Sequence, residues 1–150
     1  MLDRYSAIMR VSAVLENLRV IRRFVEDEAK RANFAGQRVD DLVLAVDEAA
    51  TNIIMHGYGV HAGTDTNVIE VEVAFRDPLL SVHLRDHARP FDPTALPVVD
   101  KLPPLTERGP GGLGVFLIRK TMDEFGYRRT PDGWNELTLS VYKPPDSQED

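Results

Sequence analysis

Glu48 and Asn52 are the residues whose types and spacing first point to chemistry in this sequence. They stand four positions apart in an expected helix, so their side chains project from one face. The neighbouring Ala45 and Ala49 are small enough to let a ligand approach that face. A carboxamide oxygen and a carboxylate so placed can share a hard cation and a water, and the carboxylate can also serve as a base. A solvated helix face has the same pattern, so the pair needs support from elsewhere.

Asp86 is the second candidate, because it closes an alternating apolar segment and opens the turn-rich stretch from Asp86 to Pro93. At the end of a strand, its carboxylate could accept a hydrogen bond from an exocyclic amine. The alternative is an Asx-turn, in which the same carboxylate bonds its own backbone.

A glycine run, Gly109 to Gly114, leads directly into an apolar segment with helical spacing. Glycines allow the backbone to approach a phosphate, and the first turn of the helix adds unpaired N–H groups. A flexible linker capped by glycine is the alternative. The run fits neither a P-loop, because no Lys-Ser/Thr ending follows, nor a dinucleotide fold, because no strand precedes it.

The stretch from Val39 to Gly59 must position the first pair, and its apolar residues repeat with a helical period. They are Val39, Leu42, Val43, Val46, Ala50, Ile53 and Ile54. This spacing predicts a helix with one buried face, and Gly57 is the expected C-terminal stop.

The remaining elements follow from periodicity and turn residues. We expect a strand over 5–11, a helix over 14–32 with Ser12 as its N-cap, and a hairpin of strands 69–75 and 80–84. An unpatterned connection over 89–112 precedes a helix over 115–122, two strands over 124–129 and 136–142, and a frayed tail over 144–150. This order predicts an α+β two-layer sandwich, with a mixed, mainly antiparallel sheet covered on one face by helices.

Composition restricts the class of protein. The chain has 150 residues, which suits a single domain, and 43% of them are hydrophobic and 28% charged. No apolar run is long enough to cross a bilayer and no leader is visible, so we expect no membrane partner and a cytoplasmic location. Cysteine is absent, which excludes disulfides and thiolate metal sites. The net charge of −6 argues against direct binding of nucleic acid.

Three motifs in fixed order resemble those of the GHKL ATPase superfamily. Glu48 to Tyr58 resembles the N box, Asp86 to Pro93 the first glycine box, and Gly111 to Gly114 the second. Within the superfamily, the short chain and the run from Gly112 to Lys120 look most like the anti-sigma-factor serine kinases. The resemblance covers nearly the whole chain as one domain.

The resemblance implies a role for each motif. Glu48 would be the general base, Asn52 the ligand of Mg²⁺, and Asp86 the acceptor for the amino group of adenine. The segment from Asp92 to Gly111 would be a lid over ATP. The other residues implied to bind ATP are Ala88, Arg108, Gly111, Gly112, Leu113, Gly114 and Thr138; Thr138 would lie near adenine and Arg108 near the γ-phosphate, although Arg108 also suits an exposed solubilising role.

One departure from the family pattern is Ala88, because the family usually has glycine two positions after the aspartate. A methyl group there could crowd the purine or strain a backbone with positive φ, which would reduce affinity for ATP. Alanine is the smallest replacement, so ATP remains the expected ligand.

The implied function is that of an Mg²⁺- and ATP-dependent serine-protein kinase that binds a sigma factor and phosphorylates an antagonist protein. The resemblance also leaves room for a homodimer. A non-catalytic module whose partner binding is gated by ATP is the main alternative, and a sensor-kinase catalytic domain is the third. Glu48 favours the kinase, since a pure switch needs no base.

Overall fold

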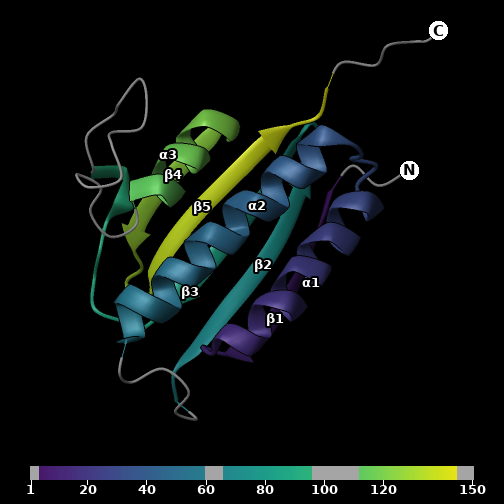
Figure 1. Cartoon of the computed structure of the whole chain (residues 1–150). Helices are drawn as coiled ribbons and strands as arrows, with labels where there is room; N and C mark the ends of the chain where they lie inside the picture. Colours follow the sequence, from purple (N-terminus) through teal and green to yellow (C-terminus); the bar gives the residue numbers. More distant parts are fainter. Residues whose placement is uncertain (1–3, 60–65, 96–111, 145–150) are drawn as a thin grey trace, which may run out of the picture.

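Five strands form one sheet, and three helices pack on one of its faces in this computed structural model (Figure 1). The structure describes residues 4–59, 66–95 and 112–144. The strands are β1 (Arg4–Ser12), β2 (Val68–Arg76), β3 (Leu79–Asp86), β4 (Glu124–Arg129) and β5 (Asn135–Tyr142). The helices are α1 (Leu18–Arg31), α2 (Gln37–Asn52) and α3 (Gly112–Thr121), with short turns η1 (Leu15–Asn17), η2 (Ile53–Tyr58) and η4 (Pro93–Ala95).

The strands lie in the order β1-β2-β3-β5-β4, and each of the four pairings is antiparallel. Residues alternate between buried and partly exposed along β2 and β3, as a sheet with one covered face requires. The buried set from the strands meets the buried stripes of α1 and α2 in one core. The predicted α+β sandwich is therefore confirmed, but the expectation of a mixed sheet is wrong, because the described strands contain no parallel pair. No helix within the described ranges has the length and hydrophobicity needed to cross a bilayer.

Two predicted helix ends are wrong. Ser12 remains the last residue of β1, and α1 begins after the 3₁₀ turn η1 with Asn17 at its N-cap. Gly57 does not end the second helix, because the chain continues from α2 into the π-helical turn η2 and stops at Gly59, whose φ is 56°. A glycine at 57 has another reason: a Cβ there would stand 3.0 Å from the Cβ of Ala88.

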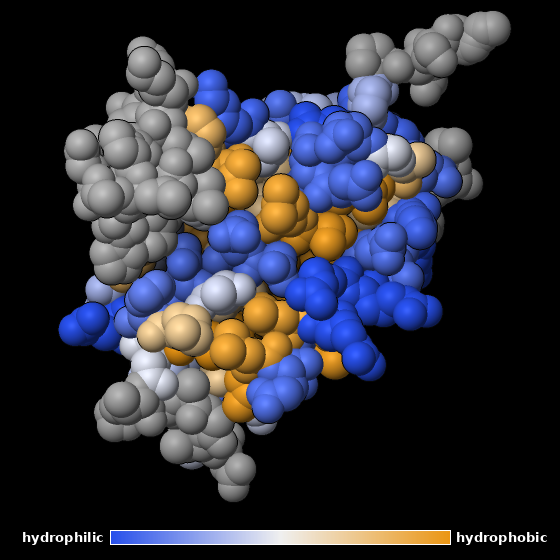
Figure 2. Space-filling view, viewed as in Figure 1, coloured by the Kyte–Doolittle hydropathy of each residue, from blue (hydrophilic) through white to orange (hydrophobic). Residues whose placement is uncertain are grey.

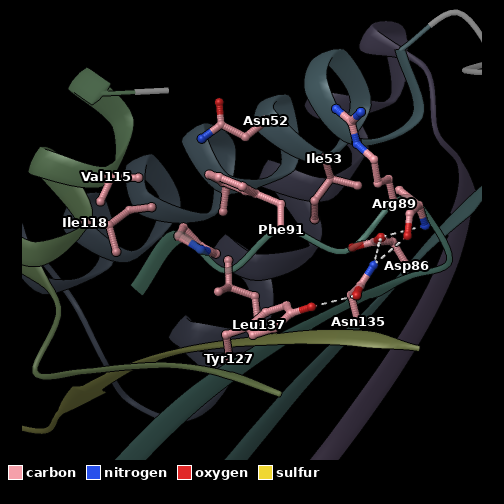
Figure 3. A pocket seen from close by; sticks show the side chains of 14 residues that line it. Asn52, Ile53, Asp86, Arg89, Phe91, Val115, Ile118, Tyr127, Asn135 and Leu137 are labelled. Atoms are coloured by element: carbon pink, nitrogen blue, oxygen red, sulfur yellow. Dashed lines mark hydrogen bonds between the residues drawn. The ribbon is translucent and has the colours of Figure 1, made fainter. Parts of the chain in front are cut away.

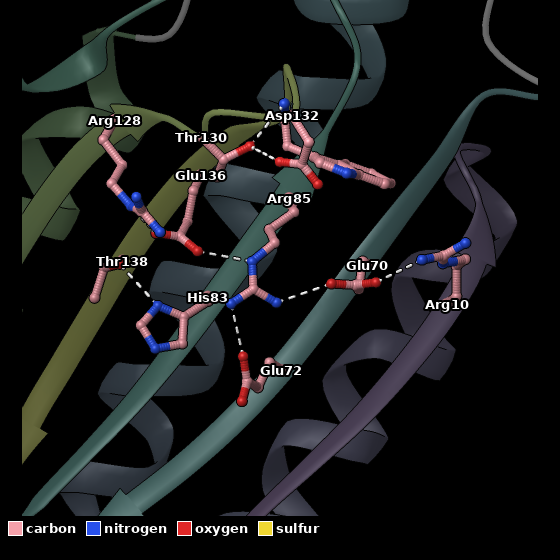
Figure 4. A network of polar contacts seen from close by, with 11 residues as sticks. Arg10, Glu70, Glu72, His83, Arg85, Arg128, Thr130, Asp132, Glu136 and Thr138 are labelled. Atoms are coloured by element: carbon pink, nitrogen blue, oxygen red, sulfur yellow. Dashed lines mark hydrogen bonds and ion pairs between the residues drawn. The ribbon is translucent and has the colours of Figure 1, made fainter.

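The face of the sheet that carries no helix is covered by ion pairs (Figure 4). Arg85 on β3 bonds three carboxylates, those of Glu70 (2.8 Å), Glu72 (2.7 Å) and Glu136 (2.7 Å). Burial alone would raise the pKa of Glu136, but hydrogen bonds from Arg128 and Arg85 outweigh it and hold this pKa below its usual value. We call this side the open face; Arg85 and Arg128 pair there with Glu70, Glu72 and Glu136.

Candidate functional site

A cavity of about 50 Å³, partly open to solvent, lies between α2, η2 and α3 and the ends of β3, β4 and β5 (Figure 3). Its lining is mostly apolar with a few convergent polar groups, as in most small-molecule sites. The lining residues are Ala49, Asn52, Ile53, Gly57, Asp86, Ala88, Arg89, Phe91, Pro93, Val115, Ile118, Tyr127, Asn135 and Leu137.

Asp86 is the charged acceptor at one end of this cavity. It is 5% exposed, and its Oδ1 accepts hydrogen bonds from the backbone N–H of Ala88 (2.9 Å) and from Asn135 Nδ2 (2.9 Å). The first bond is the Asx-turn that the sequence left as an alternative. Both bonds end on Oδ1, and Oδ2 accepts no hydrogen bond from the residues that the structure describes. The carboxylate therefore stabilises the turn with one oxygen and has the other available as an acceptor.

Burial raises the pKa of Asp86 above its ordinary value. The hydrogen bonds from Asn135 and from the backbone of Ala88, with the charges of His87 and Arg129, act against this and favour the carboxylate. Ionised Asp86 is therefore held in place by donors that compensate part of its desolvation.

Asn135 is a residue that the sequence analysis missed. It is 5% exposed, and the pairing of β3 with β5 sets it directly opposite Asp86. The only signal in the sequence was its spacing from Leu137, Leu139 and Val141. All of these separations are even, so Asn135 belongs on the same side of the strand as the three apolar residues. Using that signal requires knowing that β5 pairs with β3 in this register, and no local pattern fixes a long-range register.

Thr138 is not where the resemblance implied. It lies opposite His83 on the open face, where its Oγ1 and His83 Nδ1 are 2.8 Å apart (Figure 4). Side chains alternate between the two faces of a strand, so a residue one position from the buried Leu137 and Leu139 must face away from the cavity. The assignment of Thr138 to the adenine site is therefore wrong.

Ala88 lines the cavity and is 8% exposed. The φ of Ala88 is not positive, although the sequence analysis raised that possibility. Asn33 is the one non-glycine residue of the described segments with a positive φ. The methyl group instead faces Gly57, where the absence of a side chain leaves it room. Strain at Ala88 is thus ruled out, and Gly57 accommodates the departure from the family pattern.

Glu48, Asn52 and Gly114 meet beside the cavity, where α2 packs against α3, and Asn52 alone of the three lines it. A Cβ placed on Gly114 would lie 2.9 Å from Glu48 Oε1 and 3.5 Å from Asn52 Nδ2. Neither polar side chain makes a hydrogen bond or ion pair with any residue that the structure describes. Glycine at 114 therefore leaves a carboxylate and a carboxamide unengaged beside the first turn of α3.

Some of the other sequence candidates lie in the described structure and some lie outside it. Ala49 lines the cavity, whereas Ala45 is 1% exposed and belongs to the core. Gly112 and Leu113 belong to the first turn of α3. Arg108, Gly111 and most of the expected lid, 96–111, lie outside the described residues. The start of that segment is anchored, because Arg119 of α3 donates to the carbonyl of Thr94 (2.7 Å).

The described residues contain no group of three or more His, Asp or Glu side chains that could hold a metal by themselves. The donors at the α2–α3 contact are one carboxylate and one carboxamide. This set fits a Mg²⁺ ion that takes its remaining ligands from water and from phosphates, as magnesium in nucleotide sites usually does.

Comparisons with known proteins agree with this geometry. Residues 11–141 match the family described as histidine kinase-like ATPase domain. The serine/threonine-protein kinase BtrW of Bordetella bronchiseptica is 30% identical over 126 residues, which cover 83% of this chain and 84% of that protein. The serine-protein kinase RsbW of Bacillus cereus (strain AH187) is 28% identical over 129 residues, covering 83% and 78%.

A solved structure shows the same fold. It is the crystal structure of the RsbU and RsbW domains of Rv1364c from Mycobacterium tuberculosis, with a TM-score of 0.62 and 17% identity. The match covers 93% of this chain but 33% of that one, so this chain spans about a third of its length.

Proposed function

We propose that this chain, which belongs to the family of histidine kinase-like ATPase domains, is an ATP-dependent serine-protein kinase that acts as an anti-sigma factor and phosphorylates an anti-sigma-factor antagonist. Residues 1–150 would act as a single catalytic domain in the cytoplasm. The observation that carries the proposal is Glu48: a carboxylate without a partner among the described residues, placed beside the first turn of α3 and one helical turn from Asn52.

The base of ATP is assigned to the end of the cavity around Asp86. Apolar side chains from α3 and β5, such as Val115, Ile118 and Leu137, offer apolar surface against which a purine can pack (Figure 3). Asp86 Oδ2 is the acceptor for the exocyclic amine of adenine, and Ala88 borders the same space. A base with a carbonyl at that position would face the carboxylate with a second acceptor.

The phosphates are assigned to the α2–α3 contact. The first turn of α3, with Gly112, Leu113 and Gly114, offers backbone N–H groups and the positive end of the helix dipole. Asn52 would supply an oxygen to Mg²⁺, which would neutralise phosphate charge during transfer. Gly111 and Arg108 stay assigned to the phosphates by the resemblance alone.

Glu48 then acts on the substrate serine. It accepts the proton of the serine hydroxyl as that oxygen bonds to the γ-phosphorus, and the bond from the γ-phosphorus to the leaving ADP oxygen breaks. Exposed apolar residues lie on the same outward side of the helix, with Leu44 one turn before Glu48 and Met55 two turns after it. Figure 2 shows hydrophobic patches on this helical side, which suits a protein substrate.

The homodimer is assigned to β1. This strand is an edge of the sheet, and Ile8 on it is 59% exposed. An exposed edge strand of nine residues is a template for pairing with another strand, including that of a second copy.

The deciding experiment incubates the protein with radiolabelled ATP, Mg²⁺ and the antagonist recovered with it from native cells. We expect label on a serine of the antagonist, and labelling that is slower by about 10²–10⁴-fold when Glu48 is replaced by Gln. If nucleotide changes the affinity for the partners but label never transfers, the ATP-gated binding module is the correct function.

A further inference from the structure

The amide of Asn135 occupies a buried position between Asp86 and the edge strand β4. Its Nδ2 donates to Asp86 Oδ1 (2.9 Å) and to the carbonyl of Ala88 (2.9 Å). Its Oδ1 accepts from Tyr127 Oη (2.8 Å) and from Arg129 (3.2 Å). An amide has two N–H groups and two oxygen lone pairs, so all its hydrogen-bonding capacity is used.

These four partners fix which way the amide points. In the opposite orientation the amide oxygen would face Asp86 Oδ1 and the Ala88 carbonyl, which are both acceptors, and the NH₂ group would face the Arg129 guanidinium, which is only a donor. The donor side of Asn135 is therefore directed at Asp86 by β4, through Tyr127 and Arg129.

We propose that Asn135 is a positioning residue for nucleotide recognition: it holds Asp86 Oδ1 so that Oδ2 faces the base, and it keeps Asp86 in the ionised form. This inference rests on the proposed ATP site and adds a residue to which neither the resemblance nor the comparisons assign a role. Tyr127 and Arg129 support Asn135 from β4, so the edge of the sheet contributes to base recognition through the amide.

Several ionisable groups surround Asp86, and they must be separated from the effect of Asn135. His87 and Arg129 favour its charged form, whereas the phenols of Tyr58 and Tyr127 lie close by from η2 and β4. Arg89 lines the same cavity. Tyr58, His87 and Arg89 make no hydrogen bond to Asn135 in the described structure, whereas Tyr127 and Arg129 lose an acceptor when Asn135 is replaced. Tyr127→Phe, measured beside the Asn135 variants, separates that loss from the loss of the amide donor.

Two replacements of similar size make opposite changes. Asn135→Leu removes the donor, so Asp86 should take up a proton at higher pH than in the wild type. Asn135→Asp places a second carboxylate beside Asp86, so the two share a proton when the pair is half-ionised and repel each other when both are charged.

The test measures the affinity for ADP by calorimetry between pH 5.5 and 8.5. The terminal phosphate of ADP also ionises near neutral pH, so each variant is compared with the wild type at the same pH. Asn135→Leu should bind about 10–100-fold more weakly at pH 7, with its profile displaced to higher pH, because a hydrogen bond to a charged group is lost. The affinity of Asn135→Asp, relative to that of the wild type, should fall as the pH rises and both carboxylates become charged. Thr138→Val, on the same strand but on the open face, is the matched control and should follow the wild type.

Each outcome decides between the two levels of the proposal. A wild type that binds no ADP or ATP overturns the nucleotide site and this inference with it. A wild type that binds, with both variants following its pH profile, overturns the role of Asn135 alone. If neither variant folds, Tyr127→Phe decides: it removes one support of the amide and should weaken ADP about 2–5-fold, and unchanged affinity at every pH would overturn the inference.

Discussion

The two ends of the proposed site, around Asp86 in the cavity and around Glu48 beside it, are built in different ways. Around Asp86, the polar groups already bond one another: the carboxylate, the Asn135 amide and the Tyr127 hydroxyl form one buried network. Around Glu48, the side chains that would do chemistry have no partner among the described residues, and Gly114 keeps space beside them. One end is organised before any ligand arrives, whereas the other keeps its polar groups available.

This difference suits the tasks that we assign to the two ends. Recognition of a base benefits from fixed acceptors, since groups that are already oriented lose little freedom on binding. Phosphoryl transfer benefits from a base without protein donors, because hydrogen bonds to a carboxylate lower its basicity toward the proton of the substrate. The contrast predicts that replacing Glu48 alters the rate with little effect on affinity, whereas replacing Asp86 alters mainly the affinity.

The largest expected effect is on the rate, from Glu48→Gln. Gln is nearly isosteric and an equally good helix former, so fold and ATP affinity should stay close to wild type. The transfer of phosphate to the antagonist should fall about 10²–10⁴-fold, because the proton acceptor is lost. Calorimetry and labelled transfer measure the two quantities separately.

Two other variants complete that test. Asp47→Asn is the matched control, because Asp47 is the adjacent carboxylate but already pairs with Arg22 (2.7 Å), so its transfer rate should stay near wild type. Asn52→Ala should lose affinity and rate together, since it removes the proposed magnesium ligand. A wild-type rate in Glu48→Gln would contradict the division between the two ends.

The next effect is on affinity, from Asp86→Asn. Replacing the charged acceptor should weaken ATP about 10–100-fold, the range for loss of a hydrogen bond to a charged group. The transfer rate at saturating ATP should change far less. Asp132→Asn, an exposed carboxylate in the turn before β5, is the control and should bind ATP as the wild type does. Equal affinities for all three proteins would remove Asp86 from the base site.

The sequence predicted most of the fold because its periodicities are local. Strand β4 was predicted with its observed bounds, and the hairpin of β2 and β3 differs from its prediction by one or two residues at each end. The errors lie where tertiary contacts override a local rule. Gly57 follows the pattern of a helix stop, but its space is needed by Ala88, a residue 31 positions further along the chain.

The site was predictable where its residues belong to contiguous motifs, as Glu48, Asn52 and Gly114 do. It was not predictable where register decides. Thr138 and Asn135 lie on one strand, but an odd number of positions separates them, so they face opposite sides of the sheet. Only the pairing of β5 with β3 shows that Asn135 is the residue beside Asp86.

A smaller effect tests whether the Asp86 end is tightly built. Gly57→Ala would place its Cβ 3.0 Å from that of Ala88, and such overpacking should lower the free energy of unfolding by about 1–3 kcal/mol. Ala88→Gly should leave ATP affinity equal or better. The double variant should recover most of the stability, because the two methyl groups no longer meet. Urea unfolding of the four proteins measures the coupling, and additive losses would show that the contact is not restrictive.

The smallest effect concerns the stability cost of keeping Asp86 charged. Its pKa is raised in the folded protein, so folding favours the protonated form, and ionisation of Asp86 opposes folding above its ordinary pKa. Glu136 has the opposite sign: its pKa is lowered, so its contribution to stability is present above its ordinary pKa and is lost as the pH falls through the lowered value.

Because ionisation of Asp86 opposes folding, Asp86→Asn should be more stable than wild type at pH 7, by about 0.5–1 kcal/mol. This advantage should shrink as acid protonates Asp86. Unfolding curves at pH 5 and pH 7 measure it. A variant that is less stable than wild type at pH 7 would mean that the hydrogen bonds to the carboxylate outweigh its burial, and the Asp86 end would then be a stabilising network rather than one that gives up stability for recognition.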